Sequence, residues 1–286
     1  MNRREEGFLL LTGSFGENRR PLTSAELRIL KQCVLSGAPG PVSKEMEKQD
    51  LLELGCPEPL AEKTLQLLDD QKQLQDYLEQ GRVAGCSPLT RISQGYPGRF
   101  IACLADAAPG SLWLKGDARL LGMPAIACVG SRELEPEHAD FACQVGLWAA
   151  REGYVLVSGN ARGADTLAQE SCLDAGGKVI CVVADTLQNK KPRKNVLYVS
   201  EGGYDRPFTA QRALSRNRLI HSLGRHTFVA RCRYGTGGTW KGTVANLQAG
   251  WSPVSCYADG SEGAKELEHR GARLITLDEL PNIFPC

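Results

Sequence analysis

The sequence predicts an α/β fold in which a parallel sheet is covered by helices on both faces and is preceded by a small all-helical domain. Two observations support this class. Residues up to about 80 are poor in glycine and carry leucines at helical spacing, whereas from about residue 83 short apolar runs alternate with amphipathic helices. Apolar strands separated by helices are typical of a parallel sheet buried on both faces. We therefore place a helical domain at residues 1–82 and an α/β domain at residues 83–286.

The N-terminal domain is predicted to contain three helices. The first, over residues 23–37, opens with the capping-box pattern of Thr23 and Glu26. The second covers residues 43–55 and the third residues 58–81. The first and third helices each carry an apolar stripe, formed by Leu27, Leu30 and Val34 in the first and by Leu60, Leu67, Leu74 and Leu78 in the third. A small bundle of this kind is typical of an interaction module.

The second domain is predicted to alternate strands with helices. Strands are expected at residues 125–129, 154–158, 178–183, 196–201, 226–231, 253–257 and 272–276. Helices are expected at residues 136–152, 164–175, 209–223, 240–250 and 262–271. The first of these helices turns Phe141, Val145, Trp148 and Ala149 inward. In a parallel sheet the loops that follow the strands meet at one edge, and ligands bind at that edge.

Two of the loops at this edge combine glycine with polar or basic side chains. After the first strand, Gly130 permits a tight turn, Ser131 can donate a hydrogen bond, and the guanidinium fork of Arg132 suits a phosphate. Further on, the loop YGTGGT (residues 234–239) brings three glycines and two threonines to the start of a helix. Backbone amides and hydroxyls in this arrangement can accept an anion.

The loop SGNARGAD (residues 158–165) joins the second strand to a helix. Its glycines, Gly159 and Gly163, allow backbone amides to approach an anion, and the helix adds its positive end. The loop lacks the G-x-G-x-x-G spacing of dinucleotide sites and the lysine of a P-loop. We expect Asp165, at the helix start, to be a helix cap rather than a catalyst.

Positive charge is concentrated in one segment of the chain. Residues 188–233 hold eleven Lys and Arg against two acids, so they sum to +9 and the remaining residues must sum to −8 to give the net charge of +1. Residues 44–80 alone hold ten acids and four bases, or −6. Aromatic rings are interleaved with or follow these bases: Tyr198, Tyr204, Phe208, Phe228 and Tyr234. Several anion-accepting loops beside a basic, ring-bearing segment suit the phosphates and bases of a single-stranded nucleic acid.

Composition argues against several other classes. No apolar run approaches the length of a membrane span, and the N-terminus, MNRREEGFLLLTG, does not resemble a secretory signal. The eleven cysteines are odd in number and form no C-x-x-C pair, which indicates free thiols in a reducing cytoplasm. The four histidines lack metal-ligand spacing. We therefore expect a cytoplasmic protein with no disulfide, metal or cofactor.

Five segments in order resemble the DNA-processing protein A (DprA/Smf) family. They are YPGRFIACLADAAPGSLWLKGD, IACVGSR, VLVSGNARGADTLAQESCLDAGGKVICVV, YVSEGG and RALSRNRLIHSLG, and the resemblance runs from Tyr96 to at least Gly238. It implies an extended Rossmann-type domain after a sterile-alpha-motif-like (SAM-like) helical domain. It also implies a homodimer that binds single-stranded DNA, loads a RecA-type recombinase and acts in natural transformation.

The resemblance also implies which residues contact DNA. They are Gly130, Ser131 and Arg132 in the first loop; Ser158, Gly159, Arg162, Gly163 and Asp165 in the second; Arg216, Asn217 and Arg218 in the RNR motif; Lys191 and Lys194 in a basic loop; and Thr236 and Gly237 in the glycine-rich loop that replaces a serine-glycine-serine stretch. Since Arg216, Asn217 and Arg218 are consecutive on a helix, they cannot all face one way.

The chain departs from the family pattern in several places. Asn160 and Ala164 stand where apolar residues are common, and Gln169 replaces a frequent histidine. The chain ends at Cys286 without the winged-helix domain that many members append. These departures leave open whether the role is transformation, housekeeping recombination or defence.

Two alternative functions remain open at this point. GTGGT also resembles the P-G-G-x-G-T loop of lysine-decarboxylase-like nucleoside-monophosphate phosphoribohydrolases, but those enzymes need a glutamate three residues after the threonine, and here that residue is Gly242. No paired carboxylates, Ser-His-Asp order or activated cysteine is evident, so we expect no enzyme. The second alternative, a nucleotide sensor, would saturate with one mononucleotide, whereas a strand binder needs several nucleotides per protomer.

Overall fold

The apolar runs of the second domain form the strands of a single sheet in a computed structural model of the chain, which describes residues 1–15, 19–36 and 46–283. The strands are β1 (Ser87–Thr90), β2 (Ser111–Gly116), β3 (Ala125–Val129), β4 (Val155–Ser158), β5 (Lys178–Val183), β6 (Val196–Glu201), β7 (Thr227–Val229), β8 (Val254–Tyr257) and β9 (Arg273–Ile275). Within the described residues their order is β1-β2-β6-β5-β4-β3-β7-β8-β9. Every neighbouring pair from β6 to β9 is parallel, as predicted.

The edge formed by β1 and β2 differs from the predicted parallel sheet. β1 pairs antiparallel with β2, and β2 pairs antiparallel with β6, so the sheet is mixed. β1 is only four residues long and contains Pro88, which an edge strand tolerates because one side of it makes no ladder bonds. β2 is buried along most of its length but contains Lys115, whose Nζ donates to the Gln188 carbonyl at 2.7 Å. A proline and a buried lysine interrupt the apolar pattern that predicted the other strands.

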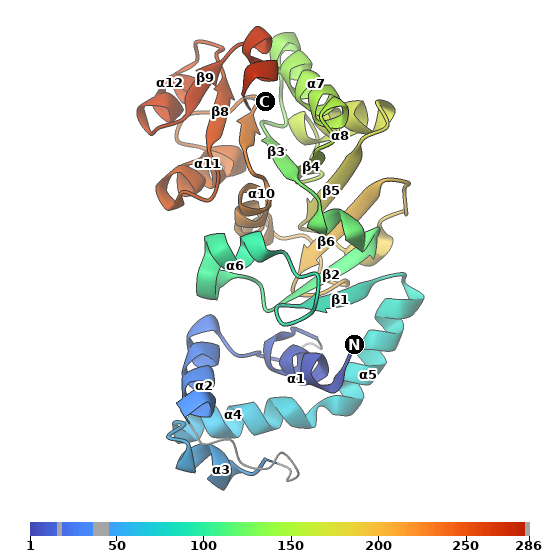
Figure 1. Ribbon diagram of the computed structural model, residues 1–286, viewed down its shortest axis with the longest axis vertical. Helices are drawn as coiled ribbons and strands as arrows, with labels where there is room; N and C mark the ends of the chain where they lie inside the picture. Colours follow the sequence, from blue (N-terminus) through green and yellow to red (C-terminus); the bar gives the residue numbers. More distant parts are fainter. Residues whose placement is uncertain (16–18, 37–45, 284–286) are drawn as a thin grey trace.

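Helices cover both faces of the sheet, which confirms the predicted fold class (Figure 1). The helices after β1 are α6 (Gly98–Leu104), α7 (Pro136–Arg151), α8 (Ala164–Asp174), α9 (Ala210–Ser215), α10 (Asn217–Leu223), α11 (Gly237–Ala249) and α12 (Glu262–His269), with 3-10 turns η1 (Ala105–Ala107), η2 (Ala118–Gly122), η3 (Leu187–Asn189) and η4 (Leu277–Asn282). In β3, Ile126 and Cys128 pack under α7 and α8, whereas Ala127 and Val129 pack under α6, α10 and α11. The inward residues predicted for α7 are all buried.

The helical region lies at one end of the molecule, beyond β1 (Figure 1). Its helices are α1 (Arg3–Thr12), α2 (Ser24–Ser36), α3 (Lys48–Glu53), α4 (Glu58–Asp69) and α5 (Gln71–Val83). The capping box of α2 is confirmed, because the Glu26 amide donates to Thr23 Oγ1 at 3.2 Å and the Thr23 amide donates to Glu26 Oε2 at 2.7 Å. Residues 43–45 of the second predicted helix lie outside the described residues, and Val34 is 45% exposed rather than part of the buried stripe.

The third predicted helix is broken at Asp70, where α4 ends and α5 begins. The guanidinium of Arg19 lies at the break, where it donates to the Leu67 carbonyl at 3.1 Å and forms an ion pair with the Asp70 carboxylate. An arginine that takes a carbonyl from the last turn of a helix satisfies an acceptor that the helix itself leaves free. Because Arg19 is distant in sequence, periodicity alone could not predict this junction.

Two expectations about the chain as a whole can be compared with the structure. None of the helices formed by the described residues combines the length and apolar character needed to cross a bilayer. The described cysteines are all free thiols, as expected from their number and spacing. Burial raises the pKa of several of them, including Cys172 to about 11, so these thiols stay protonated and act as small apolar side chains.

The buried His226 should make folding sensitive to acid. Its Nε2 lies 2.8 Å from Ser255 Oγ, and burial, with a smaller contribution from the charge of Arg273, lowers its pKa to about 4. A depressed folded-state pKa stabilises the fold above the unfolded-state value near 6.5, and this stability is lost as pH falls toward 4. His226→Gln removes this titration, so the difference in free energy of unfolding between the two proteins should shrink by about 2 kcal/mol from pH 7 to pH 5.

Urea unfolding of wild type and His226→Gln at both pH values measures this difference. Other titrating groups, including Asp165, cancel in the comparison because both proteins carry them. A difference that stays constant between pH 7 and pH 5 would show that His226 titrates alike in both states.

Candidate nucleic-acid interface

The candidate site lies where the strand order reverses, because β3 has β4 on one side and β7 on the other. Loops after β3, β4 and β7 meet at this reversal, which is where open α/β sheets bind ligands. Two adjoining hollows open there, with cavity volumes of about 760 and 510 Å³. The two hollows share six of their lining residues, namely Arg132, Glu133, Ala161, Phe208, Ala213 and Arg216. The two hollows therefore form one continuous depression along the carboxyl edge of the sheet.

Most of the predicted site residues line these hollows. The larger hollow is lined by Gly130, Ser131, Arg132, Asp165, Arg216, Asn217, Thr236 and Gly237, and the smaller one adds Gly159 and Arg162. The residues that line neither hollow are Ser158, Gly163, Lys191, Lys194 and Arg218. The structure therefore brings together the first, second and glycine-rich loops and two of the three residues of the RNR motif.

Gly163 holds the first two loops together rather than facing a ligand. Its φ is +92°, and a Cβ there would lie 2.4 Å from the Ser131 carbonyl oxygen and 2.7 Å from Arg132 Cα. The next amide, of Ala164, donates to the Ser131 carbonyl at 3.2 Å. The backbones of the two loops are thus in direct contact, and this contact fixes where Arg132 leaves the sheet.

Asp165 does not cap the helix that follows it, which corrects the sequence-based expectation. Its Oδ2 accepts hydrogen bonds from the amides of Gly159 at 3.0 Å and Ala161 at 3.2 Å, both in the loop before α8. Burial raises the pKa of Asp165, while the charge of Arg216 and the bonds from the loop oppose this rise. The amides of Gly159 and Ala161 are therefore engaged by a carboxylate of the chain rather than facing an anion, and they hold the loop in shape.

Arg216 forms the wall between the two hollows. Its guanidinium packs so closely over Gly159 that a Cβ on that glycine would lie 1.7 Å from Nη1. Burial lowers the pKa of Arg216, and the charge of Asp165 opposes the change. Its buried Nε and Nη1 find no hydrogen-bond partner among the described residues. These donors are left unsatisfied by the described residues, and because the guanidinium also belongs to a residue that lines both hollows, its charge can attract an anion into either one.

The three residues of the RNR motif point in different directions. The single helix predicted over residues 209–223 is broken at Arg216 into α9 and α10. Asn217 Nδ2 donates to the Gly238 carbonyl at 3.0 Å and so ties α10 to the glycine-rich loop. Arg218 instead pairs with Glu201 at the end of β6, at 2.5 Å. Of the two arginines only Arg216 offers its charge to the hollows, and the charge of Arg218 is paired with Glu201 outside them.

The glycine-rich loop becomes the N-terminal turn of α11. Thr236 is the N-cap residue and Gly237 the first helical residue, so free backbone amides and the helix dipole face the larger hollow. Thr239 Oγ1 donates to the Gly130 carbonyl at 2.8 Å, which joins this loop to the first one. Lys241, in the same turn, is exposed and lines the larger hollow. The prediction named this loop but missed the lysine.

The charge of the basic segment is largely balanced by nearby acids. Among the described residues, six of its eleven bases form ion pairs: Lys190 with Asp185, Arg193 with Glu170, Arg206 with Asp205, Arg218 with Glu201, Arg231 with Glu135 and Arg233 with Glu133. Four of these acids come from outside residues 188–233, so the sum of +9 overstates the local field. Arg132, Arg162 and Lys241 form no ion pair within the described chain, and they line the hollows.

The five rings of the basic segment divide into core and surface. Tyr198, Tyr204 and Phe228 are buried and belong to the core. Their interpretation as rings that stack on nucleic-acid bases is therefore wrong. Phe208 is 55% exposed and Tyr234 is 47% exposed. Phe208 lines both hollows and is thus the ring best placed to stack on a ligand. The sequence indicated Phe208 as a binding residue because it lies among Lys and Arg residues. The sequence could not distinguish this ring from the buried ones.

Lys191 and Lys194 lie away from the hollows. Both are exposed in the loop between β5 and β6, which runs from the carboxyl edge of the sheet to the amino edge. Lys194 precedes Asn195, whose carbonyl accepts from the Val179 amide near the start of β5. Lys194 therefore stands at the edge opposite to the site. Ser158 is fully buried at the end of β4, so its side chain is not accessible to a ligand.

One group of potential metal ligands occurs at a place where the sequence shows no spacing typical of a metal site. Within the described residues, Glu135, Glu137 and His138 bring ligand atoms within 4.8 Å of one another at the start of α7. Two of the three already have partners, since His138 Nε2 lies 2.9 Å from Asp259 and Glu135 lies 3.0 Å from Arg231. The group lines neither hollow, and its evident role is to pair charges beside the first loop.

Fold and site together define an α/β protein of the Rossmann type whose carboxyl-edge loops form a basic, ring-bearing depression. A family model described as DNA recombination-mediator protein A matches residues 87–283, and the chain belongs to this family. The resemblance deduced from the sequence motifs is thereby confirmed.

Individual relatives agree with this assignment. The chain is 31% identical over 182 residues to the DNA processing protein DprA of Streptococcus pneumoniae, covering 59% of this chain and 64% of that protein. It is 29% identical over 206 residues to protein Smf of Escherichia coli, covering 65% and 53%. It thus spans less than two thirds of either relative. The X-ray structure of DprA from S. pneumoniae matches with a TM-score of 0.68 at 25% identity, covering 93% of this chain and 99% of that one.

The contact between the first two loops predicts a selective effect of adding one methyl group. Gly163→Ala should lower the free energy of unfolding by roughly 2–5 kcal/mol, because backbone strain adds to a clash with backbone atoms that cannot move aside. Gly176→Ala, at the other end of α8, is the matched control: φ there is +78° but the space around a Cβ is open. It should cost only about 1 kcal/mol. Urea unfolding of both variants tests this, and equal losses would contradict the close approach of the loops.

Proposed function

We propose that the protein binds single-stranded DNA across the two hollows and acts as a recombination mediator without hydrolysing its ligand. The observation that carries this proposal is the wall between the hollows. There Arg216 presents buried donors without partners in the described chain, beside the exposed ring of Phe208. A guanidinium for the phosphate backbone and a ring for a base, repeated along an open groove, are what a sequence-tolerant strand binder needs.

The relatives support the ligand. The family description names a DNA recombination mediator. A solved structure of DNA processing protein A from Helicobacter pylori, described as having a unique single-stranded DNA binding mode, matches with a TM-score of 0.58 at 22% identity, covering 69% of this chain and 94% of that one. At that identity the match supports the fold alone. The proposal that this chain binds the same kind of ligand rests on the residues that line its own hollows.

The carboxylates of the hollows favour binding over catalysis. Asp165 is occupied by two backbone amides, Glu133 by Arg233, and Asp185 by Lys190. The position that carries glutamate in phosphoribohydrolases is Gly242, where a Cβ would lie 3.1 Å from Asn217 Cβ and 3.2 Å from His221 Nε2. A glutamate there would have to displace the side chains of Asn217 and His221. His221 is neutral, because burial and then the charge of Arg216 lower its pKa to about 3.

The proposal includes the finer assignments that the family resemblance implies. The protein would load a RecA-type recombinase, form a homodimer and work in the cytoplasm. Among the site residues, Arg132, Arg162, Arg216 and Lys241 would contact phosphates, with Asn217, Thr236 and Gly237 shaping the groove. Ser158, Gly163 and Arg218 would support it from behind. Lys191 and Lys194, which line neither hollow, would make at most distant contacts.

Removing one unpaired cation should weaken DNA binding without regard to sequence. Arg132→Ala and Arg162→Ala should each lower affinity for an oligonucleotide roughly three- to tenfold, and each should flatten the slope of log K against log salt by about 0.7. Fluorescence anisotropy with labelled single strands over a salt series measures both quantities. Arg151→Ala, an exposed cation at the end of α7 on the opposite edge, is the matched control and should change neither.

Wild-type affinity in both Arg132→Ala and Arg162→Ala would refute this use of the hollows. A parallel assay for free base released from AMP, together with double-stranded competitor, separates the alternatives. Base release without strand binding would favour the phosphoribohydrolase alternative. Saturation by one mononucleotide would favour a sensor.

Phe208→Ala tests the stacking contact separately from charge. Base stacking on an aromatic ring contributes about 1–3 kcal/mol, so affinity should fall roughly 5- to 160-fold. The salt slope should stay unchanged, because no cation is removed. Tyr234→Ala removes a second ring of similar exposure that lines neither hollow and provides the comparison. Equal losses in the two variants would show that Phe208 has no special position.

A further inference from the structure

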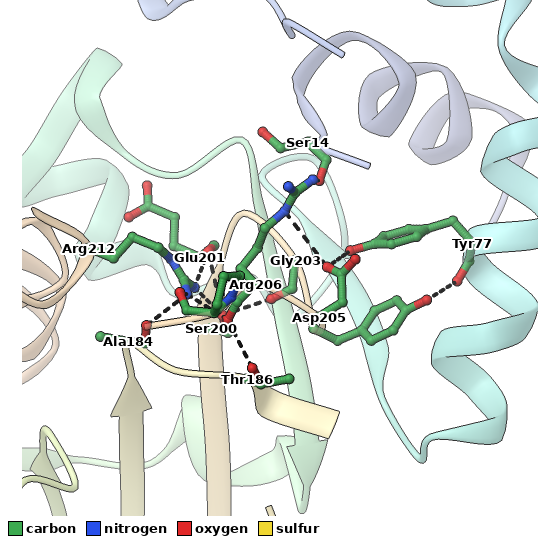
Figure 2. A network of polar contacts seen from close by, with 12 residues as sticks. Ser14, Tyr77, Ala184, Thr186, Ser200, Glu201, Gly203, Asp205, Arg206 and Arg212 are labelled. Atoms are coloured by element: carbon green, nitrogen blue, oxygen red, sulfur yellow. Dashed lines mark hydrogen bonds and ion pairs between the residues drawn. The ribbon is translucent and has the colours of Figure 1, made fainter. Parts of the chain in front are cut away.

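The segment that joins β6 to α9 connects the helical region with the DNA-binding depression. We call residues 202–209 the strap. Its first part is buried or half-buried against α5, and it becomes exposed from Pro207 to Thr209. Phe208 is therefore carried on a segment whose other end is packed against the helical region. Figure 2 shows the polar contacts that hold the strap on both sides.

On one side the strap is fastened to the helical region. Tyr77 Oη, from α5, donates to Asp205 Oδ1 at 2.6 Å, and Tyr204 Oη donates back to the Tyr77 carbonyl at 3.1 Å (Figure 2). The two rings also pack together, with centroids 4.5 Å apart. The Arg206 guanidinium donates to the Ser14 carbonyl, just after α1. Burial, and then the hydrogen bond to Asp205, raise the pKa of Tyr77, so its hydroxyl stays a donor at physiological pH.

On the other side the strap is fastened to the sheet by Arg212. One nitrogen, Nη1, donates to the carbonyls of Ala184 at 2.7 Å, Arg206 at 2.8 Å and Pro207 at 2.7 Å. The other, Nη2, donates to Ser200 Oγ at 3.1 Å and to the Glu201 carbonyl at 3.3 Å. The fork thus joins the second half of the strap, at Arg206 and Pro207, to the end of β6 and to the loop after β5 (Figure 2). A lysine could not make these bonds together, because its single ammonium lacks the planar fork.

The residues immediately before and after Phe208 are held by hydrogen bonds, whereas its ring is not. The carbonyl of Pro207, one residue before, is held by Arg212, and Thr209, one residue after, caps α9 by accepting from the Arg212 amide at 3.0 Å. The ring itself is 55% exposed and borders both hollows. The backbone is fixed while the ring is left free for a ligand, which is how a preorganised contact is built.

We propose that Tyr77 and Arg212 are positioning residues for the ring of Phe208, and that the helical region acts on DNA binding through the strap. This rests on the proposed function. The strap contains two adjacent glycines, Gly202 and Gly203, and would sample many conformations if it were released. A ring on a released strap must be ordered when DNA binds, and that cost lowers affinity. The acidic helical region thus contributes to binding without touching a phosphate.

A double-mutant cycle on the full chain tests the inference. Arg212→Lys keeps the charge but loses the fork, and Tyr77→Phe loses one hydroxyl while keeping the ring. Affinity for a fluorescein-labelled oligothymidylate is measured by anisotropy for each variant, with and without Phe208→Ala. We expect each variant to weaken binding several-fold in the wild-type background and not to weaken it further in the Phe208→Ala background, because residues that act through one side chain are non-additive.

The control for Tyr77→Phe is Tyr96→Phe. Tyr96 Oη is also buried and donates to the Pro109 carbonyl at 2.7 Å, but this bond makes no contact with the strap. Tyr96→Phe should bind DNA as the wild type does. Circular dichroism confirms the folding of each variant, and if Arg212→Lys fails to fold, Tyr77→Phe carries the cycle.

The outcomes separate this inference from the function on which it rests. If Phe208→Ala itself binds as tightly as the wild type, stacking in the proposed function is wrong. If Phe208→Ala weakens binding but Tyr77→Phe and Arg212→Lys lower affinity equally with and without the ring, the positioning role is wrong. Wild-type affinity in both variants also overturns it.

Discussion

The site depends on the burial of two opposite charges beneath it, the carboxylate of Asp165 and the guanidinium of Arg216. Asp165 accepts hydrogen bonds from the amides of Gly159 and Ala161, and the guanidinium of Arg216 packs against Gly159. Both charged side chains therefore fix the conformation of the loop after β4. Each charge offsets part of the cost of burying the other, so removing either would leave the other without that compensation. The remaining loops follow from this pair, because Gly163 brings the first loop against the second, and Thr239 and Asn217 attach the glycine-rich loop to both β3 and α10.

This arrangement changes how charge in the segment should be interpreted. A long basic run suggests a broad positive surface, yet carboxylates from α8 and from the loops after β3 and β5 pair with many of its bases. What a polyanion meets is a few unpaired cations on different loops, namely Arg132, Arg162 and Lys241, around the wall of Arg216. Surface ion pairs contribute little to stability. Their effect here is to confine the positive field to the depression, so that under the proposed function a strand would be attracted along one track.

The sequence was sufficient for the parts of the fold whose signals are local. Buried strands, their helices and the three glycine-bearing loops follow from periodicity and from glycine placement, and the motifs identified the family. What it missed arises from contacts between distant residues. Arg19 pairs with Asp70 where the third helix is broken, the turn of Arg216 toward Gly159 accompanies the break between α9 and α10, and Lys115 hides the apolar pattern of β2. The sequence also could not predict which aromatic rings are exposed. Phe208 and Phe228 occur in the same basic segment, but only Phe208 reaches the surface.

The position of the ring also bears on the choice between a strand and a mononucleotide as ligand. Phe208 and Arg216 both stand where the two hollows join, so a small ligand seated in one hollow would leave the other cations unused. A strand that crosses this junction can place a base on the ring and phosphates on either side of it. Catalysis on a nucleotide requires water to be excluded around a free acid or base. The carboxylates here are engaged, the ring stands exposed, and the depression continues past it. These features favour a track for a chain of nucleotides over a closed reaction chamber.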